Sequence, residues 1–173
     1  MEERENSRQE ENLTKTKEVN KMKNRFACFC LLCLWVTSCS SDRLFESYQG
    51  MEDLNWHMED TVKFELPTEL GKHKNLIGIK YTEEYPFRNL YLRYMLRDST
   101  GKITQNILLD IPLFDSKTGS PLGKGFGSTF TKYDTVPADL TAKYSQVEML
   151  QYMRLEKLQG IEAVGLKVVS VKN

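Results

Sequence analysis

Cysteine has the most reactive side chain in this sequence, and its four copies lie close together, at Cys28, Cys30, Cys33 and Cys39. A thiol can bind a metal, form a disulfide or accept an acyl group. No cysteine lies between Ser40 and Asn173, which excludes a disulfide framework in the body of the chain. The first three thiols lie among apolar residues with no histidine nearby, which argues against a metal cluster.

The residues before Cys39 have the composition of a secretory signal peptide. Basic residues precede an apolar stretch, Phe26–Val36, that is too short to span a bilayer. The sequence that follows, Val36-Thr37-Ser38-Cys39, resembles the lipobox of bacterial lipoproteins. We therefore predict a signal peptide over 22–38 and a lipidated Cys39, whose acyl chains hold the protein on a membrane.

Two further segments flank this signal. Residues 1–21 are polar and mixed in charge, which predicts a disordered extension. Our hypothesis is that Met22 is the true initiator and that residues 1–21 are not translated; a reporter fusion insensitive to changing Met22 would contradict it. Residues 39–58 are predicted to form the lipidated N-terminus and a tether, with Leu54 and Trp56 the first side chains to dock on the folded domain.

The glycines and histidines offer little chemistry. The glycine-rich stretch Gly123–Ser128 lacks the spacing and the hydroxyl group of a phosphate-binding loop, so we interpret it as a turn or bulge between strands. The two histidines, His57 and His73, lie in polar neighbourhoods without a second ligand nearby. We expect both to be exposed to solvent, and we predict no metal and no cofactor.

Two pairs of carboxylates are the other candidates for catalysis. Glu83 with Glu84, and Asp110 with Asp115, are the kind of pair that glycoside hydrolysis uses. Solvated turn residues are the better interpretation, because adjacent carboxylates on a strand point to opposite faces. The chain also lacks a nucleophile elbow. We therefore predict that the protein is not an enzyme.

Aromatic residues gather through the middle of the chain. Most are expected to lie in the core, but a few exposed rings would suit stacking on a sugar ring or a protein partner. A glycan-binding function therefore stays open as an alternative. The residues concerned are Trp56, Tyr81, Tyr85, Phe87, Tyr91, Tyr94, Phe126, Phe130 and Tyr133.

The charge balance excludes one class of partner. The chain has 24 basic and 24 acidic residues, and removing residues 1–38 leaves a net charge of about −1. Nucleic-acid-binding domains normally show a clustered basic excess, so no nucleic acid partner is expected.

The body of the chain alternates apolar and polar residues with the period of two that is typical of half-buried strands. Turn signals separate these runs, and no long helical stretch lies between them. Residues 59–173 are therefore predicted to form an all-β domain, a single antiparallel β-sandwich resembling a jelly roll. Residues 153–159 are expected to form a helical turn or a loop. The alternating runs are Val62–Leu66, Ile77–Tyr81, Asn89–Arg97, Ile103–Ile111, Val147–Met153 and Val164–Val168.

Several motifs, taken in order, are similar to a known family. Tyr85–Leu92, Gly123–Ser128, Gln151–Arg154, Leu158, Gly160-Ile161 and Val164–Leu166 resemble the GldH gliding-motility lipoproteins of Bacteroidetes. The similarity covers most of residues 39–170. Among the motif residues, Gln151 and Arg154 are expected to be hydrogen-bonded core groups rather than ligand contacts.

The resemblance implies a lipid-anchored, non-catalytic accessory or scaffold protein of a gliding-motility and type IX secretion apparatus. Its partners would be the membrane, through the acyl anchor, and envelope proteins of that machine. Ser40, rather than an aspartate, follows Cys39. This favours the outer membrane, with the domain facing the periplasm. The resemblance supplies no catalytic residues.

Overall fold

The computed structural model describes residues 42–67, 70–138 and 143–171. Their secondary structure is almost entirely strand, with one short 3-10 helix, η2, at Glu52–Leu54. None of the described helices is long and apolar enough to cross a membrane. The strands are β1 (Arg43–Gly50), β2 (Asn55–His57), β3 (Val62–Glu65), β4 (His73–Thr82), β5 (Asn89–Arg97), β6 (Ile103–Pro112), β7 (Lys124–Phe126), β8 (Thr129–Thr135), β9 (Gln146–Gln151), β10 (Lys157–Gln159) and β11 (Ile161–Ser170).

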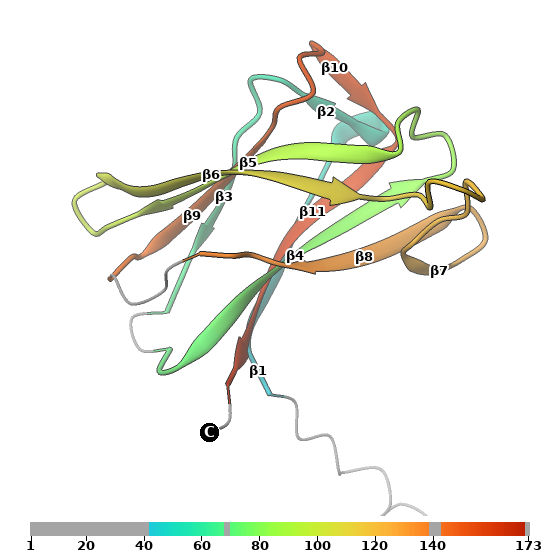
Figure 1. Ribbon diagram of the computed structural model, residues 1–173. Coiled ribbons are helices and arrows are strands. Elements are labelled where there is room, and N and C mark those ends of the chain that lie inside the picture. The colour runs from blue at the N-terminus through green and yellow to red at the C-terminus, as the bar shows by residue number, and fades with distance from the viewer. Residues whose placement is uncertain (1–41, 68–69, 139–142, 172–173) are drawn as a thin grey trace, which may run out of the picture. The chain divides into compact units, whose positions relative to one another are not determined.

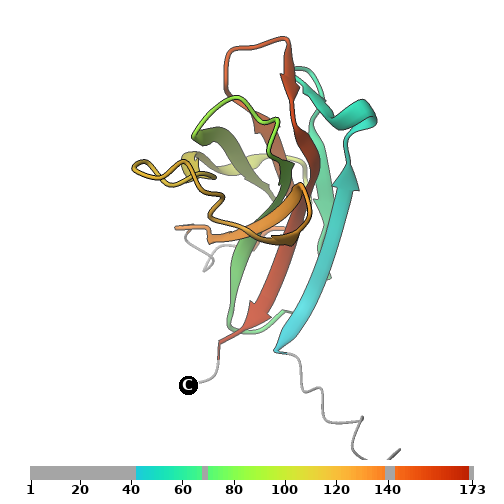
Figure 2. The ribbon, with the colours of Figure 1, turned by 90° about the vertical axis from the view of Figure 1, so that its right-hand side faces the viewer.

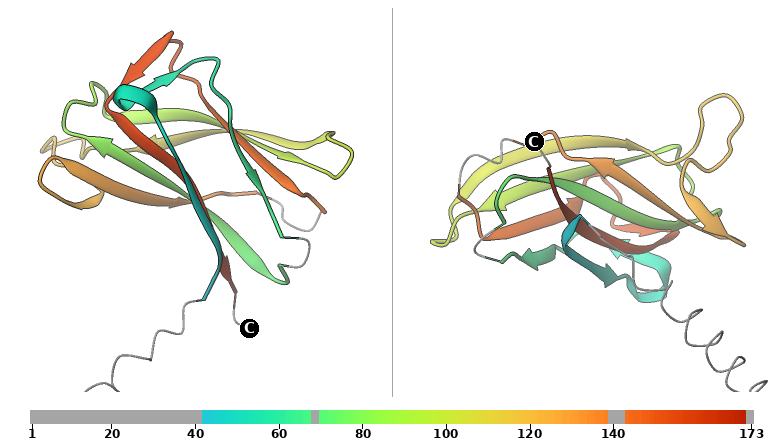
Figure 3. Two further views of the ribbon diagram at one scale, coloured as in Figure 1. Left: turned by 180° about the vertical axis from the view of Figure 1, so that it is seen from behind. Right: turned by 90° about the horizontal axis from the view of Figure 1, so that it is seen from below.

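The strands form two main antiparallel sheets and a small ribbon (Figure 1; Figure 2). One sheet has the order β1-β11-β4-β8-β7, and the other has the order β3-β9-β5-β6. The ribbon pairs β10 with β2. The first and last strands of the chain are neighbours, so the start of β1 lies beside the end of β11 (Figure 3). The predicted all-β sandwich is confirmed.

The core fills the space between the two main sheets, and the period-two pattern identifies its members. The central strand β5 buries alternate residues completely, while their neighbours face outward. Strands β4 and β11 follow the same rule. Fully buried side chains include Leu90, Leu92, Tyr94, Leu96, Ile77, Ile79, Tyr81, Val164, Leu166 and Val168.

The predicted start of the folded domain at residue 59 is wrong. Residues 43–50 form β1, which pairs with β11 along its whole length, and the folded unit begins at Asp42. The pattern was not evident because the core-facing positions of β1 are Phe45, Ser47 and Gln49, of which only one is apolar. A segment with so little alternation of apolar and polar residues gives no strand signal, so the sequence predicts a linker there.

Two local predictions also change. Trp56 is fully buried, as expected, but Leu54 is exposed, because η2 holds it in a turn with positive φ. The segment 153–159 is not helical, but residues 153–156 form a loop, the other predicted possibility. The segment also contains β10, where the buried Leu158 pairs with Trp56 of β2. This pairing caps one end of the sandwich, at the top of Figure 1.

Candidate functional site

An open cavity of about 700 Å³ lies where β5 begins and β6 ends. The turn before β5 supplies Arg88, and the strand's first residue is Asn89. Strand β6 and the loop after it supply the opposite wall. The remaining lining residues are Asp110, Pro112, Phe114, Asp115, Ser116 and Leu122.

Asn89 and Asp110 form the centre of this cavity. They lie on adjacent strands in diagonal positions, since Asp110 is opposite Tyr91 in the β5–β6 register. The side-chain amide of Asn89 donates a hydrogen bond of 2.5 Å to Asp110 Oδ1. The pair presents hydrogen-bond donors and acceptors on two paired strands. Asp110 is a strand residue, so its interpretation as a turn residue is wrong.

Asp115 lies in the turn after β6, as predicted. Its Oδ1 accepts the backbone N–H groups of Thr118 (2.8 Å) and Lys117 (2.9 Å) and the Thr118 hydroxyl. These bonds, those from Thr118 and Lys117 foremost, lower the pKa of Asp115 below its ordinary value. A general acid for glycoside hydrolysis needs a raised pKa. Although the fold brings Asp110 and Asp115 to one cavity, Asp115 is therefore built to stay ionised and to hold its own turn.

Aromatic rings pack beneath the cavity. The half-buried Phe114 meets Tyr81 edge-on, with ring centroids 5.3 Å apart, and stacks on Tyr85 at 6.5 Å. The Tyr81 hydroxyl donates to the carbonyl oxygen of Leu113 and accepts the N–H of Gly123, which fixes the loop after β6. The rings thus serve mainly as core, and Phe114 is the one that lines the cavity.

The other aromatic residues divide as expected between core and surface. Trp56, Tyr81, Tyr85 and Tyr94 are buried, and Phe130 is half-buried. Phe87, Tyr91, Phe126 and Tyr133 are exposed, and Phe126 is 98% exposed.

Phe126 lies at the tip of the glycine-rich hairpin that joins β7 to β8. Gly127 takes a positive φ of 66° in this turn, and a Cβ at Gly125 would lie 2.0 Å from the Thr129 carbonyl oxygen. The stretch is therefore a turn between strands, as predicted.

The two histidines lie in different surroundings. His57 is exposed at the end of β2. His73 is half-buried instead of exposed: its Nδ1 bonds the Gly71 carbonyl oxygen and its Nε2 lies 2.7 Å from the Tyr144 hydroxyl. The buried Asn75 donates to the hydroxyls of Tyr144 and Tyr94, which completes this cluster. Within residues 42–67, 70–138 and 143–171, no three potential metal ligands come together.

Two motif residues differ from one another. Gln151 is buried, and its side chain accepts the Met153 N–H at 2.8 Å and donates to the Leu155 carbonyl oxygen. It is a hydrogen-bonded core group, as predicted. Arg154 is exposed with a positive φ of 59°, so the same prediction is wrong for it. Glu83 and Glu84 lie exposed in the turn after β4, as expected.

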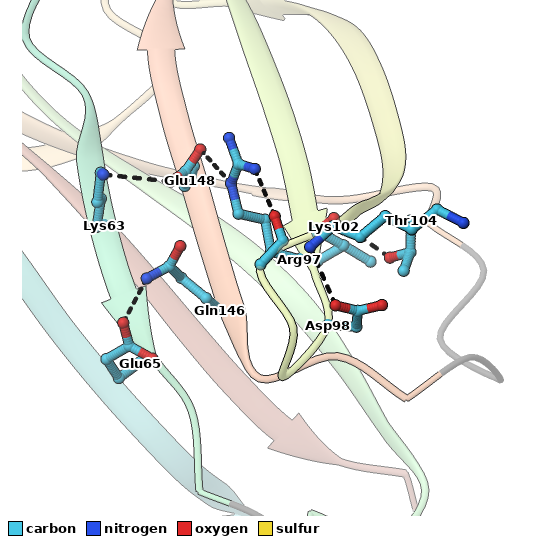
Figure 4. A network of polar contacts seen from close by, with 10 residues as sticks. Lys63, Glu65, Arg97, Asp98, Lys102, Thr104, Gln146 and Glu148 are labelled. Carbon is cyan, nitrogen blue, oxygen red and sulfur yellow. Dashed lines mark hydrogen bonds and ion pairs between the residues drawn. The ribbon is translucent and has the colours of Figure 1, made fainter.

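The outer face of the four-stranded sheet carries a network of charges (Figure 4). The Glu148 carboxylate, only 6% exposed, contacts Arg97 Nε at 2.8 Å and Lys63 Nζ at 3.4 Å. Arg97 also donates to the Gly101 carbonyl oxygen. A second contact in the figure joins Gln146 to Glu65. These groups pair with one another across β3, β9 and β5. We therefore interpret the network as fixing the strand register rather than as a ligand-binding site.

The two sheets define an antiparallel β-sandwich domain, and the sequence comparisons identify its family. A model of the GldH lipoprotein family matches residues 43–168, nearly the whole folded unit. The chain belongs to this family of lipoproteins, which are held on membranes by attached lipid.

Two curated relatives match most of the chain. One is a gliding motility lipoprotein GldH homolog from Christiangramia forsetii, 26% identical over 168 residues, covering 88% of this chain and 100% of the relative. The other is the gliding motility lipoprotein GldH of Flavobacterium johnsoniae, 24% identical over 153 residues, covering 80% and 91%. Cys39 and the predicted signal peptide lie outside the described residues.

Proposed function

We propose that this protein is a non-catalytic scaffold or accessory lipoprotein of a gliding-motility and type IX secretion apparatus, anchored in the outer membrane and facing the periplasm. The observation that supports this most is the family match over residues 43–168, together with two relatives named for gliding motility. The protein would act by binding, using a rigid sandwich to present surfaces to other envelope proteins.

The arrangement of polar groups favours binding over catalysis. The Asp115 carboxylate accepts hydrogen bonds within its own turn, and the Glu148 carboxylate forms ion pairs with Arg97 and Lys63. Asp110 accepts a hydrogen bond from Asn89 in the cavity. The neighbouring carboxylate, Asp115, has a lowered pKa and is therefore a poor general acid.

Membrane attachment would come from Cys39. Cys39→Ala should abolish incorporation of labelled palmitate and move the protein out of the membrane fraction, because the acyl chains supply the affinity. Cys33→Ala is the matched control and should leave both unchanged. Retention of label in Cys39→Ala would contradict the assignment.

The scaffold proposal is tested by affinity purification of the lipidated protein from cross-linked envelopes, read by mass spectrometry. Motility or secretion subunits should be recovered with the native chain and lost with Cys39→Ala. Recovery of glycan alone, or of the same proteins from both, would refute the scaffold function.

A glycan-binding function is the second candidate, and the cavity is the observation that favours it. Arg88, Asn89 and Asp110 supply donors and acceptors beside the Phe114 ring, a combination that suits a sugar. Co-sedimentation of the protein with purified peptidoglycan tests this candidate. Asp110→Asn should reduce the bound fraction, whereas Glu83→Gln, an exposed turn residue outside the cavity, should not. Equal binding by both variants would exclude the cavity as a glycan site.

A further inference from the structure

Strand β6 differs from the other strands that lie at the edge of a sheet. It is ten residues long, Ile103–Pro112, and within the described residues it pairs only with β5. The edge strands β7 and β3 have three and four residues, and β1 carries Arg43 and Glu46. Proteins usually protect a free edge with charges, short strands, bulges or proline. β6 carries one charged residue, Asp110, its proline is the last residue, and the one register shift in its ladder with β5 lies at its start, between Ile103 and Gln105.

The hydrogen bonds of β5 show which groups of β6 are free. Tyr91 accepts the Tyr152 N–H and donates to Met153 Sδ, so both of its backbone groups point to β9 and away from β6. In an antiparallel ladder, the residue opposite such a position points its own groups outward. Asp110 is opposite Tyr91, and Leu108 is opposite Arg93. The N–H and C=O groups of Asn106, Leu108 and Asp110 therefore face the free edge.

A second opening lies beside this edge, between the two main sheets. A cavity of about 290 Å³ reaches the core residues Ile77 and Ile111 and is bordered by Leu108, Pro137 and Thr135. It exists because β7 covers β8 only over Thr129–Thr131, which leaves Lys132–Thr135 without a neighbour on that side in the described chain. The sandwich is thus incompletely closed between β6 and β8.

We propose that β6 is a strand-addition site, which takes an extended segment of another envelope protein as one more strand of the four-stranded sheet. The segment would bond the outward N–H and C=O groups of Asn106, Leu108 and Asp110. Its alternate side chains, small and apolar, would enter the cavity over Ile77 and Ile111. This inference deepens the proposed scaffold function and rests on it.

The charges and the cavity decide the chemistry of the segment. Two carboxylates, Asp110 and Asp134, line the cavity, while one ammonium, Lys132, lies 3.1 Å from Asp134. A basic residue in the partner segment would complete this rim. A second copy of this chain fits less well: in a β6–β6 pair, the core-facing side chains such as Ile111 already fill their own sandwich and cannot enter the other's cavity.

The experiment places a photo-cross-linking amino acid at Leu108 in the lipidated full-length chain in living cells, with Leu44 on edge strand β1 as the control position. Both side chains are exposed. Digested adducts should contain, for Leu108 alone, a segment of another envelope protein that alternates apolar residues and carries a lysine or arginine. Equal adducts at both positions, adducts between two copies of this chain, or no adduct at Leu108 would overturn the proposal.

Two variants separate the backbone from the side chain at this position. Leu108→Pro removes an outward N–H that β5 does not use, whereas Leu108→Thr changes the side chain and keeps the N–H. Binding of the cross-linked segment, made as a synthetic peptide, should weaken by roughly tenfold or more for Leu108→Pro and much less for Leu108→Thr. Equal binding by both variants would overturn strand addition.

Amide hydrogen exchange gives an independent readout that needs no substitution. On adding the synthetic segment to the native protein, the amides of Asn106, Leu108 and Asp110 should become protected, whereas those of Ile107 and Leu109, already bonded to β5, should change little. Protection that excludes β6 would overturn the inference. Recovery of motility subunits by Leu108→Pro as fully as by the native chain would refute strand addition alone; failure of the native chain to recover any would refute the scaffold function itself.

Discussion

A glycine pair on the outer face of the five-stranded sheet supports a specific prediction about stability. Tyr48 on β1, Gly165 on β11, Gly78 on β4 and Tyr133 on β8 lie in one row across the sheet. The Tyr48 ring lies over both glycines, and its hydroxyl donates a 2.7 Å hydrogen bond to the Tyr133 hydroxyl. A Cβ at Gly165 would lie 2.4 Å from Tyr48 Cε1, so alanine there must displace the ring.

Two opposing contributions set the size of the effect of Gly165→Ala. Alanine in place of glycine in a strand gains about 0.5–1 kcal/mol of folding free energy. Against it, the displaced ring costs about 1–2 kcal/mol of packing and about 1 kcal/mol for the lost hydrogen bond. Gly165→Ala should therefore destabilise the protein by about 1–2.5 kcal/mol. In a Tyr48→Ala background only the gain remains, and the same substitution should stabilise by about 0.5–1 kcal/mol.

The assay is urea unfolding of the mature chain with Cys39→Ala, followed by tryptophan fluorescence. The control is Gly50→Ala, because a Cβ there meets nothing closer than the Glu162 carbonyl oxygen at 3.9 Å. It should be neutral or stabilising whether or not Tyr48 is present. If Gly165→Ala changes the free energy of unfolding by the same amount in both backgrounds, the ring does not depend on the glycine and the reasoning fails.

Three further predictions concern other parts of the fold. Trp56→Ala should cost about 3–5 kcal/mol in urea unfolding, followed here by circular dichroism since the substitution removes the fluorophore, because the fully buried indole also bonds a carbonyl oxygen. A loss below about 1 kcal/mol would show that β2 and β10 contribute little to stability. Arg97→Met should cost about 3 kcal/mol by leaving Glu148 buried without its main partner, and adding Glu148→Gln should recover part of this; no recovery would contradict the pairing. The pKa of Glu46 is lowered, above all by the hydrogen bond from Arg43, so the ionised Glu46 stabilises the fold at neutral pH and this stabilisation is lost as the pH falls through the folded pKa. Glu46→Gln should therefore flatten the acid side of a plot of unfolding free energy against pH. An unchanged plot would refute this.

The sequence predicted those strands whose two faces differ in polarity. In β5, Leu90, Leu92 and Leu96 alternate with outward residues, so the pattern alone indicates the strand and its buried face. Strand β1 has no such contrast, and only its pairing with β11 makes it part of the sheet. A long-range pairing of the first strand with the last leaves no local signal.

The candidate site was harder to predict for a related reason. Aspartate favours turns, so the sequence predicts a turn at Asp110, yet cross-strand pairing with β5 keeps it in β6. Periodicity shows which way a side chain faces, but it does not show which strand lies at the edge of a sheet. The free edge of β6 follows only from the order β3-β9-β5-β6.

The early start of β1 also restricts how the protein can act. With lipid on Cys39, the chain has four residue steps before β1 begins at Arg43, which allow at most about 14 Å of extended chain. A tether over residues 39–58 would have allowed several times that reach. The proposed scaffold, held on so short a segment, could not reach partners far from the bilayer. The segment that adds to β6 should therefore belong to a protein of the same membrane or be delivered to it.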